Sequence, residues 1–180
     1  MKVQVIYSSI TGCTKRVAEA IYHGLTTDDK SIHDLKDGVP VLDGDIILMG
    51  YWGKNGNPNN EMKAFLNTVK GKVVGVFCTL GYYADSEHAF QTVQAGLASL
   101  KEDNEVICSY VCNGAVSKQL IAGQGKDTPH TPNEQKEIRW EIIKDHPTKA
   151  ECDLASERFN ERIYLYERCK ELNIPFTSIL

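Results

Sequence analysis

The chain has 180 residues, the size of one domain with a proper hydrophobic core. Its 20 basic and 24 acidic residues give a net charge of −4, and the absence of any basic run argues against nucleic acid as a partner. No apolar stretch has the length of a membrane span, and Met1-Lys2-Val3 leads directly into an expected strand, so we expect a cytosolic protein that does not enter membranes.

A strand, a hydroxyl-rich turn and a helix are expected first. The strand is the apolar run Val3–Tyr7, and the helix follows from apolar residues at i, i+3, i+4 and i+8, namely Val17, Ala20, Ile21 and Leu25. The turn between them holds Ser8, Ser9, Thr11, Gly12 and Thr14. Free N–H groups and the positive dipole at a helix start attract an anion, hydroxyls add hydrogen bonds, and glycine lets the main chain approach closely. The turn therefore predicts a phosphate cradle, with an ordinary Ser/Thr-rich helix cap as the alternative.

The same turn excludes several other phosphate sites. It lacks both the G-x-x-x-x-G-K-[ST] pattern of a P-loop and the G-x-G-x-x-G of a dinucleotide fold. A C-x5-R phosphatase loop starting at Cys13 would need arginine where Glu19 stands. No basic residue lies between Ser8 and Thr14, which favours a terminal phosphate monoester held by neutral donors over a metal-bound triphosphate.

Strands and helices alternate through the next hundred residues. Near-continuous apolar runs typical of buried parallel strands occur at Asp45–Tyr51, Lys72–Thr79 and Glu105–Val111, and a weaker run at Ser31–Leu35 predicts a strand at the sheet edge. Helical patterns lie between them, with Met62, Phe65, Leu66 and Val69 on one face and Phe90, Val93, Leu97 and Leu100 on another. This alternation predicts an α/β fold, a three-layer α/β/α sandwich in one domain.

The sequence is less regular after Asn113. We expect a short helix or an added strand at Ala115–Ala122 and a loop at Gly123–Thr131. Capping boxes at 131–134 and 148–151 predict two helices. The first carries Ile138, Ile142 and Ile143 and stops at His146-Pro147, and the second runs to about Leu172 and packs Ala155, Phe159, Ile163 and Tyr166. This gives an extra segment at about 113–147 before the C-terminal helix.

Two further strand exits carry adjacent aromatic residues with glycines. One follows the third strand with Tyr51, Trp52, Gly53, Lys54, Asn55 and Gly56, and the other follows the fourth with Thr79, Leu80, Gly81, Tyr82 and Tyr83. Carboxyl ends of parallel strands meet at one edge of a sheet, so these exits should lie beside the phosphate cradle. Aromatic faces and main-chain polar groups together suit a planar ring with a polar edge.

The segment Ser8–Thr14 resembles the [ST]-x-T-G-x-T phosphate loop of flavodoxins, and Gly-Tyr-Trp and Thr-Leu-Gly at the later exits resemble their second and third FMN loops. The resemblance covers residues 1 to about 112 and, weakly, the last helix. It implies a flavodoxin-like five-stranded parallel sheet in the order 2-1-3-4-5 and noncovalent binding of FMN. The residues it assigns to the cofactor are Ser8, Ser9, Thr11, Gly12, Cys13, Thr14, Tyr51, Trp52, Gly53, Lys54, Asn55, Gly56, Thr79, Leu80, Gly81, Tyr82 and Tyr83.

The resemblance implies an electron carrier between a reductase and a terminal oxidoreductase, in which no residue acts as acid or base. Either Gly53 or Gly56 could turn a peptide carbonyl toward the ring. Lys54 could instead stabilise the charge of the reduced ring, and the alternative is that its side chain is simply solvated. An FMN-dependent NAD(P)H oxidoreductase acting on a quinone or other small acceptor is the alternative, with Ala115–Pro147 covering the ring or forming a pocket or docking surface. A scaffold that has lost its cofactor is a third reading.

The remaining polar residues suggest no metal site. Five histidines show no ligand spacing, and six cysteines fit neither a disulfide framework nor a zinc site. We expect the thiols to be buried and reduced. The sequence does not give the oligomeric state.

Overall fold

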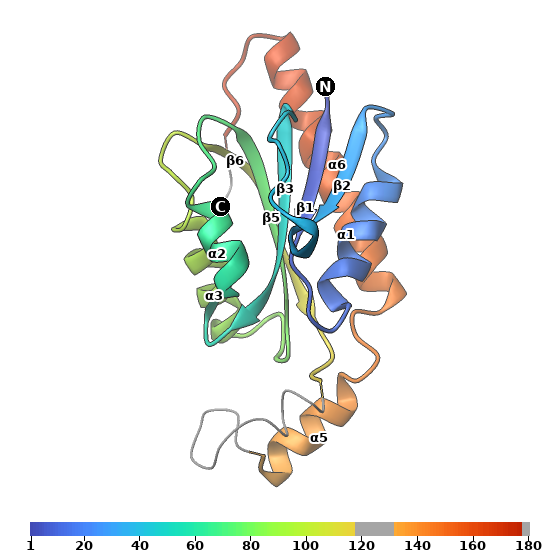
Figure 1. Ribbon diagram of the computed structural model, residues 1–180. Helices are drawn as coiled ribbons and strands as arrows, with labels where there is room; N and C mark the ends of the chain where they lie inside the picture. Colours follow the sequence, from blue (N-terminus) through green and yellow to red (C-terminus); the bar gives the residue numbers. More distant parts are fainter. Residues whose placement is uncertain (118–131, 178–180) are drawn as a thin grey trace.

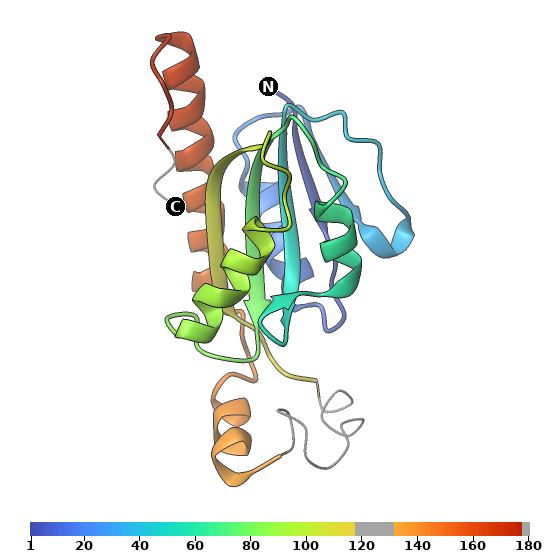
Figure 2. The same cartoon turned by 90° about the vertical axis from the view of Figure 1, so that its left-hand side faces the viewer.

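The computed structural model describes residues 1–117 and 132–177 and shows a parallel sheet with helices on both faces (Figures 1 and 2). The strands are β1 (Val3–Tyr7), β2 (Lys30–Asp34), β3 (Ile46–Lys54), β4 (Asn57–Pro58), β5 (Val73–Leu80) and β6 (Glu105–Asn113). The helices are α1 (Cys13–Gly24), α2 (Asn60–Leu66), α3 (Glu87–Leu97), α5 (Glu134–Ile142) and α6 (Lys149–Glu171), with a 3₁₀ turn at Leu35–Asp37. The predicted three-layer sandwich is confirmed.

The sheet has the order β2-β1-β3-β5-β6, and all neighbours on this path are parallel. This is the order 2-1-3-4-5 of the expected five strands, because β4 lies off the path and pairs only with β3. The weak segment near residue 31 does form the edge strand β2. The order brings the exits of β1, β3 and β5 to one edge of the sheet.

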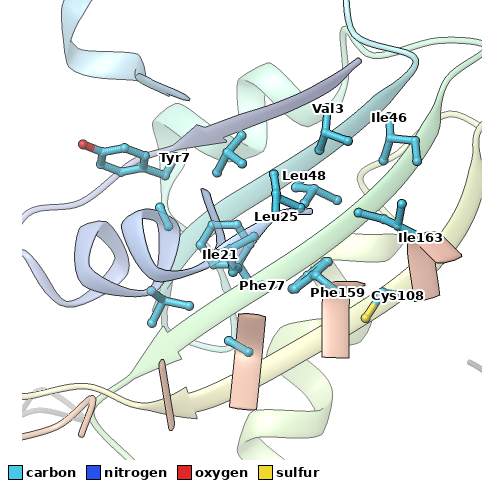
Figure 3. Packing of buried hydrophobic residues seen from close by; sticks show 14 of the residues in the cluster. Val3, Tyr7, Ile21, Leu25, Ile46, Leu48, Phe77, Cys108, Phe159 and Ile163 are labelled. Atoms are coloured by element: carbon cyan, nitrogen blue, oxygen red, sulfur yellow. The ribbon is translucent and has the colours of Figure 1, made fainter. Parts of the chain in front are cut away.

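A hydrophobic core fills each side of the sheet. Between the sheet and helices α1 and α6, Phe77 meets Phe159 edge to face with ring centroids 6.0 Å apart (Figure 3). The predicted core residues of α6, Ala155, Phe159, Ile163 and Tyr166, are all buried. On the other side, helices α2 and α3 cover a second cluster. All six cysteines are buried and unpaired, as expected.

Helix α3 is turned differently from the prediction. Phe90 was expected on its buried face but is 60% exposed, and the residues buried there are Ala89, Thr92, Val93 and Gly96. The cause lies on β3, where Tyr51 fills the space under the helix. A Cβ added at Gly96 would lie 2.1 Å from the Tyr51 hydroxyl oxygen, so only glycine fits there. Facing Gly96 toward Tyr51 rotates Phe90 out to solvent.

Helix α5, which belongs to the extra segment before α6, lies beyond the edge of the sheet where the parallel strands end (Figure 1). Helix α5 is capped by Asn133, whose side chain accepts from the Lys136 N–H at 2.9 Å, and not by Thr131 as predicted. Ile138 and Ile142 are exposed, whereas the following Ile143 is buried. The capping box at Thr148 is confirmed.

Two of the expected elements fall wholly or mostly outside the described residues. The loop expected at Gly123–Thr131 and most of Ala115–Ala122 lie outside the described residues, while residues 115–117 are neither helix nor strand. Within residues 1–117 and 132–177, no helix is long and apolar enough to cross a bilayer.

Candidate functional site

The turn between β1 and α1 is open at its glycine. Gly12 precedes the first residue of α1 with a φ of 87°, in the left-handed region, and a Cβ built there would meet nothing within 4 Å. Ser9 Oγ accepts from the Gly12 N–H at 3.1 Å, which fixes the turn. Thr11 is exposed and Ser9 is half-buried, so both hydroxyls border the open space.

Helix α1 begins without a cap. Helices α3, α5 and α6 each start with a side chain that accepts from the first turn, but α1 has none. The N–H groups of residues 9–11 and 13–15 donate to no described residue, and the first amide of α1 with an acceptor is that of Arg16, which donates to the Gly12 carbonyl at 3.0 Å. Six amide donors at the positive end of a helix form an anion-binding site.

Two hydroxyls assigned to this turn are engaged elsewhere. Ser8, which is 4% exposed, donates to Glu61 Oε2 at 2.6 Å and accepts from Asn59 Nδ2 at 2.9 Å. Thr14, 1% exposed, has its Oγ1 2.9 Å from that of Thr79. These bonds fasten the turn to α2 and β5. In the structure both side chains shape the cradle, whereas Ser9 and Thr11 are the hydroxyls left open to a ligand. Contact of Ser8 and Thr14 with the cofactor stays a prediction.

The Cys13 thiol faces the extra segment and not the cradle. It is buried, with Sγ 3.5 Å from the His146 carbonyl oxygen and 3.7 Å from that of Ala115. Arg16 donates to the same His146 oxygen at 2.7 Å, so this cation is also turned away. What Cys13 offers the cradle is its backbone N–H.

The second exit is a tight hairpin. Gly53 pairs with Pro58 and Lys54 with Asn57, and the two residues between them have positive φ, 51° at Asn55 and 73° at Gly56. These features describe a two-residue turn of type I′, for which Asn-Gly is the strongest sequence signal. We expected only a strand exit here, although the Asn-Gly dipeptide that identifies the hairpin is present in the sequence.

The two aromatic residues before this hairpin lie on opposite faces of β3. Tyr51 is fully buried under α3, where its hydroxyl donates to the Thr92 carbonyl at 3.2 Å and burial raises its pKa. This corrects the expectation that its side chain borders a ring. Trp52 is half-buried, and its carbonyl accepts from the Asn59 N–H at 3.1 Å. Gly53 is held close to Leu80 and Thr92, where an added Cβ would lie 3.2 and 3.1 Å from their side chains.

At the third exit, two accessible tyrosines follow two buried residues. Thr79 and Leu80 are buried, whereas Tyr82 is half-buried and Tyr83 is 41% exposed. Gly81 lets Val116 approach, since a Cβ there would lie 2.3 Å from a Val116 methyl carbon. The guanidinium carbon of Arg139 lies 4.4 Å from the centroid of the Tyr82 ring.

Four residues of this site were not predicted. Asn59 and Glu61 hold Ser8, Val116 packs on Gly81, and Arg139 stacks on Tyr82. The first two stand close to the recognised exits, but no sequence signal connects Val116 or Arg139 with them, because both come from the extra segment.

The residues at this edge fit a phosphate-bearing planar cofactor. Six amides without an acceptor in the described part of the chain, together with two open hydroxyls, suit a phosphate monoester. Trp52, Tyr82 and Tyr83 offer apolar surface beside main chain held by the hairpin. The described residues contain no group of three or more His, Cys, Asp or Glu side chains that could hold a metal ion. The donor set is thus that of a neutral phosphate site.

Comparison with known proteins places the chain among flavodoxin-like sequences. A model of the flavodoxin domain matches residues 4–160. The flavodoxin-like domain-containing protein BilS of Clostridioides difficile is 30% identical over 125 residues, 68% of this chain and 71% of that protein. BilS of Clostridium symbiosum is 25% identical over 138 residues, covering 67% of this chain and 72% of the relative.

Solved structures show the same fold at low sequence identity. A Fusobacterium nucleatum flavodoxin bound to flavin mononucleotide has a TM-score of 0.56 at 14% identity, covering 93% of this chain and 97% of that one. A flavodoxin described as WrbA-like, from Agrobacterium tumefaciens, has a TM-score of 0.51 at 16% identity, covering 91% and 98%.

Proposed function

Because the chain belongs to the flavodoxin domain family, we propose that it binds FMN noncovalently and carries electrons in the cytosol between a reductase and a terminal oxidoreductase. The observation that carries this proposal is the uncapped start of α1, where six amides donate to no described residue and the hydroxyls of Ser9 and Thr11 border the open space. When bound, FMN supplies the redox chemistry, and the protein supplies binding, orientation and access.

Each part of the edge has a task in this proposal. The cradle of residues 9–15 holds the 5′-phosphate through neutral donors, since Arg16 is committed to His146. Trp52, Tyr82 and Tyr83 flank the ring and exclude water from its faces. The hairpin fixes the main chain beside the ring's polar edge. Gly56, in the turn, is better placed than Gly53 to present a carbonyl, because Gly53 is wedged against Leu80 and Thr92.

A comparison of two flavins tests the phosphate cradle. The double variant Ser9→Ala with Thr11→Ala should weaken FMN binding about tenfold to hundredfold, because each hydroxyl contributes a charge-assisted hydrogen bond. Riboflavin, which lacks the phosphate, should bind the variant and the parent protein equally. Fluorescence titration measures both affinities, and Thr26→Ala, an exposed threonine away from the site, is the matched control. Equal affinity of the double variant and the parent for FMN would refute the cradle.

A stand-alone FMN-dependent NAD(P)H oxidoreductase is the second candidate. The observation that favours it is the contact of Arg139 with Tyr82, which brings α5 beside the third exit, where it could border a substrate pocket. NAD(P)H oxidation by the FMN-loaded protein, with a quinone and no partner protein, separates the two functions. Rapid turnover supports the enzyme, whereas reduction only when a reductase is added supports the carrier.

A further inference from the structure

Arg139 ties the extra segment to the third exit. Its guanidinium carbon lies 4.4 Å from the Tyr82 ring centroid, well within the range of a cation–π contact. The same ring makes edge contacts with Tyr83 and His88, each at 5.7 Å between centroids. Arg139 is half-buried, and its Nε atom is buried without a hydrogen-bond partner among the described residues. Among the described residues, the contact that holds the guanidinium is therefore the aromatic face of Tyr82.

The charge of Arg139 is not neutralised by an ion pair with any described carboxylate. The pairs at this end of the molecule involve other cations: Lys15 lies 3.6 Å from Glu19, and Lys144 pairs with Glu141. The Arg16 guanidinium instead donates a hydrogen bond to the His146 carbonyl. Partial burial also reduces the screening of the Arg139 charge by water. The third exit, which carries Tyr82, therefore lies in the electrostatic field of the positive charge of Arg139.

The segment that carries Arg139 is anchored at its base. The His146 carbonyl accepts from the Ala115 N–H at 3.0 Å and from Arg16, which joins the entrance of the segment to its exit and to α1. The His146 ring lies 2.7 Å from Glu151 Oε2, which also accepts from the Thr148 N–H at 2.6 Å. Arg139 is thus placed on Tyr82 by a segment fixed to α1 and α6, so its charge is preorganised.

We propose that Arg139 tunes the redox potential of the bound cofactor by stabilising the negative charge that the FMN ring gains on reduction. The inference rests on the proposed binding of FMN. A fixed cation in a partly desolvated site favours the reduced form over the oxidised form, and it does so without moving when the electron arrives. Arg139 touches no reacting atom in this role, and Tyr82 is the platform that positions it.

Reduction potentials of the FMN-loaded protein test this role. Arg139→Gln should weaken the binding of reduced FMN relative to oxidised FMN by about tenfold, which is seen as a more negative midpoint potential. Arg139→Lys, which keeps the charge, should retain most of the parent value. Tyr82→Leu removes the platform and should shift the potential in the same direction as Arg139→Gln. Because salt screens a partly exposed charge, the difference in midpoint potential between the parent protein and Arg139→Gln should become smaller as ionic strength rises.

Controls separate charge from structure. Lys136→Gln lies on the same helix and removes the same unit of charge, and it should leave the potential unchanged. An unchanged potential in Arg139→Gln with FMN bound would overturn the inference. So would equal, salt-independent shifts in Arg139→Gln and Arg139→Lys, which would assign Arg139 a packing role only. Failure of the parent protein to bind FMN is a different result, because it would remove the proposed function itself.

Discussion

At the scale of single residues, Tyr51 shows how alternation along a strand divides two adjacent aromatics between core and site. Tyr51→Phe should lower the free energy of unfolding by about 1 kcal/mol, because the bond to the Thr92 carbonyl is lost while the ring still fills the core. FMN affinity should not change. Urea unfolding and flavin fluorescence measure the two effects. A large loss of FMN binding in a variant that still folds would show that the Tyr51 side chain does belong to the FMN-binding site.

Glu61 places a carboxylate next to the phosphate cradle, through the hydroxyl of Ser8. A negative charge there opposes a bound phosphate, so Glu61→Gln should tighten FMN binding by about threefold at low salt, while glutamine still accepts from Ser8. Riboflavin should bind the variant as it binds the parent. Matched titrations with the two flavins check this. Weaker FMN binding in Glu61→Gln would show instead that the carboxylate is needed to shape the turn.

At the scale of elements, the β3–β4 hairpin depends on its two residues of positive φ. Gly56→Ala should cost about 1 kcal/mol of stability, since a side chain disfavours a φ of 73°. It should also weaken FMN binding, because the main chain of the second exit shifts. Asn55→Gly is the control, since glycine accepts the φ of 51° without strain. Chemical denaturation and FMN titration report both changes, and equal behaviour of the two variants would argue against a type I′ turn.

Elements differed in how far the sequence could predict them. The five parallel strands followed from apolar runs, and the long helix α6 from its capping box, because both signals are local. The rotation of α3 was not predictable in this way, because it is set by Gly96 meeting Tyr51 from another element. The Asn-Gly turn was a local signal that was missed. The site shows the same division. The phosphate cradle was predicted from a local motif, whereas the contact between Arg139 and Tyr82 was not, because it joins residues 57 positions apart.

At the scale of the whole molecule, burial of thiols and tyrosines predicts a loss of stability in alkali. Burial raises the pKa of the Cys108 thiol from 9.0 to about 11, and burial with the nearby Asp34 carboxylate raises that of Tyr7 from 10.0 to about 12. Both groups are neutral in the folded protein at neutral pH. The unfolded chain releases their protons at lower pH than the folded chain does, so ionisation favours unfolding as pH rises.

The sign and the window of this effect can be tested together. The stability that these groups contribute is complete below about pH 9 and should fall as pH rises through 11 and 12. Urea unfolding at pH 7, 9 and 10.5 should therefore show a plateau followed by a decline. Cys108→Val, which keeps an apolar side chain in the core and removes the thiol, should reduce the slope of the decline between pH 9 and 11. An unchanged slope would mean that Cys108 ionises at the same pH in the folded and unfolded chains, and that its burial does not couple stability to pH.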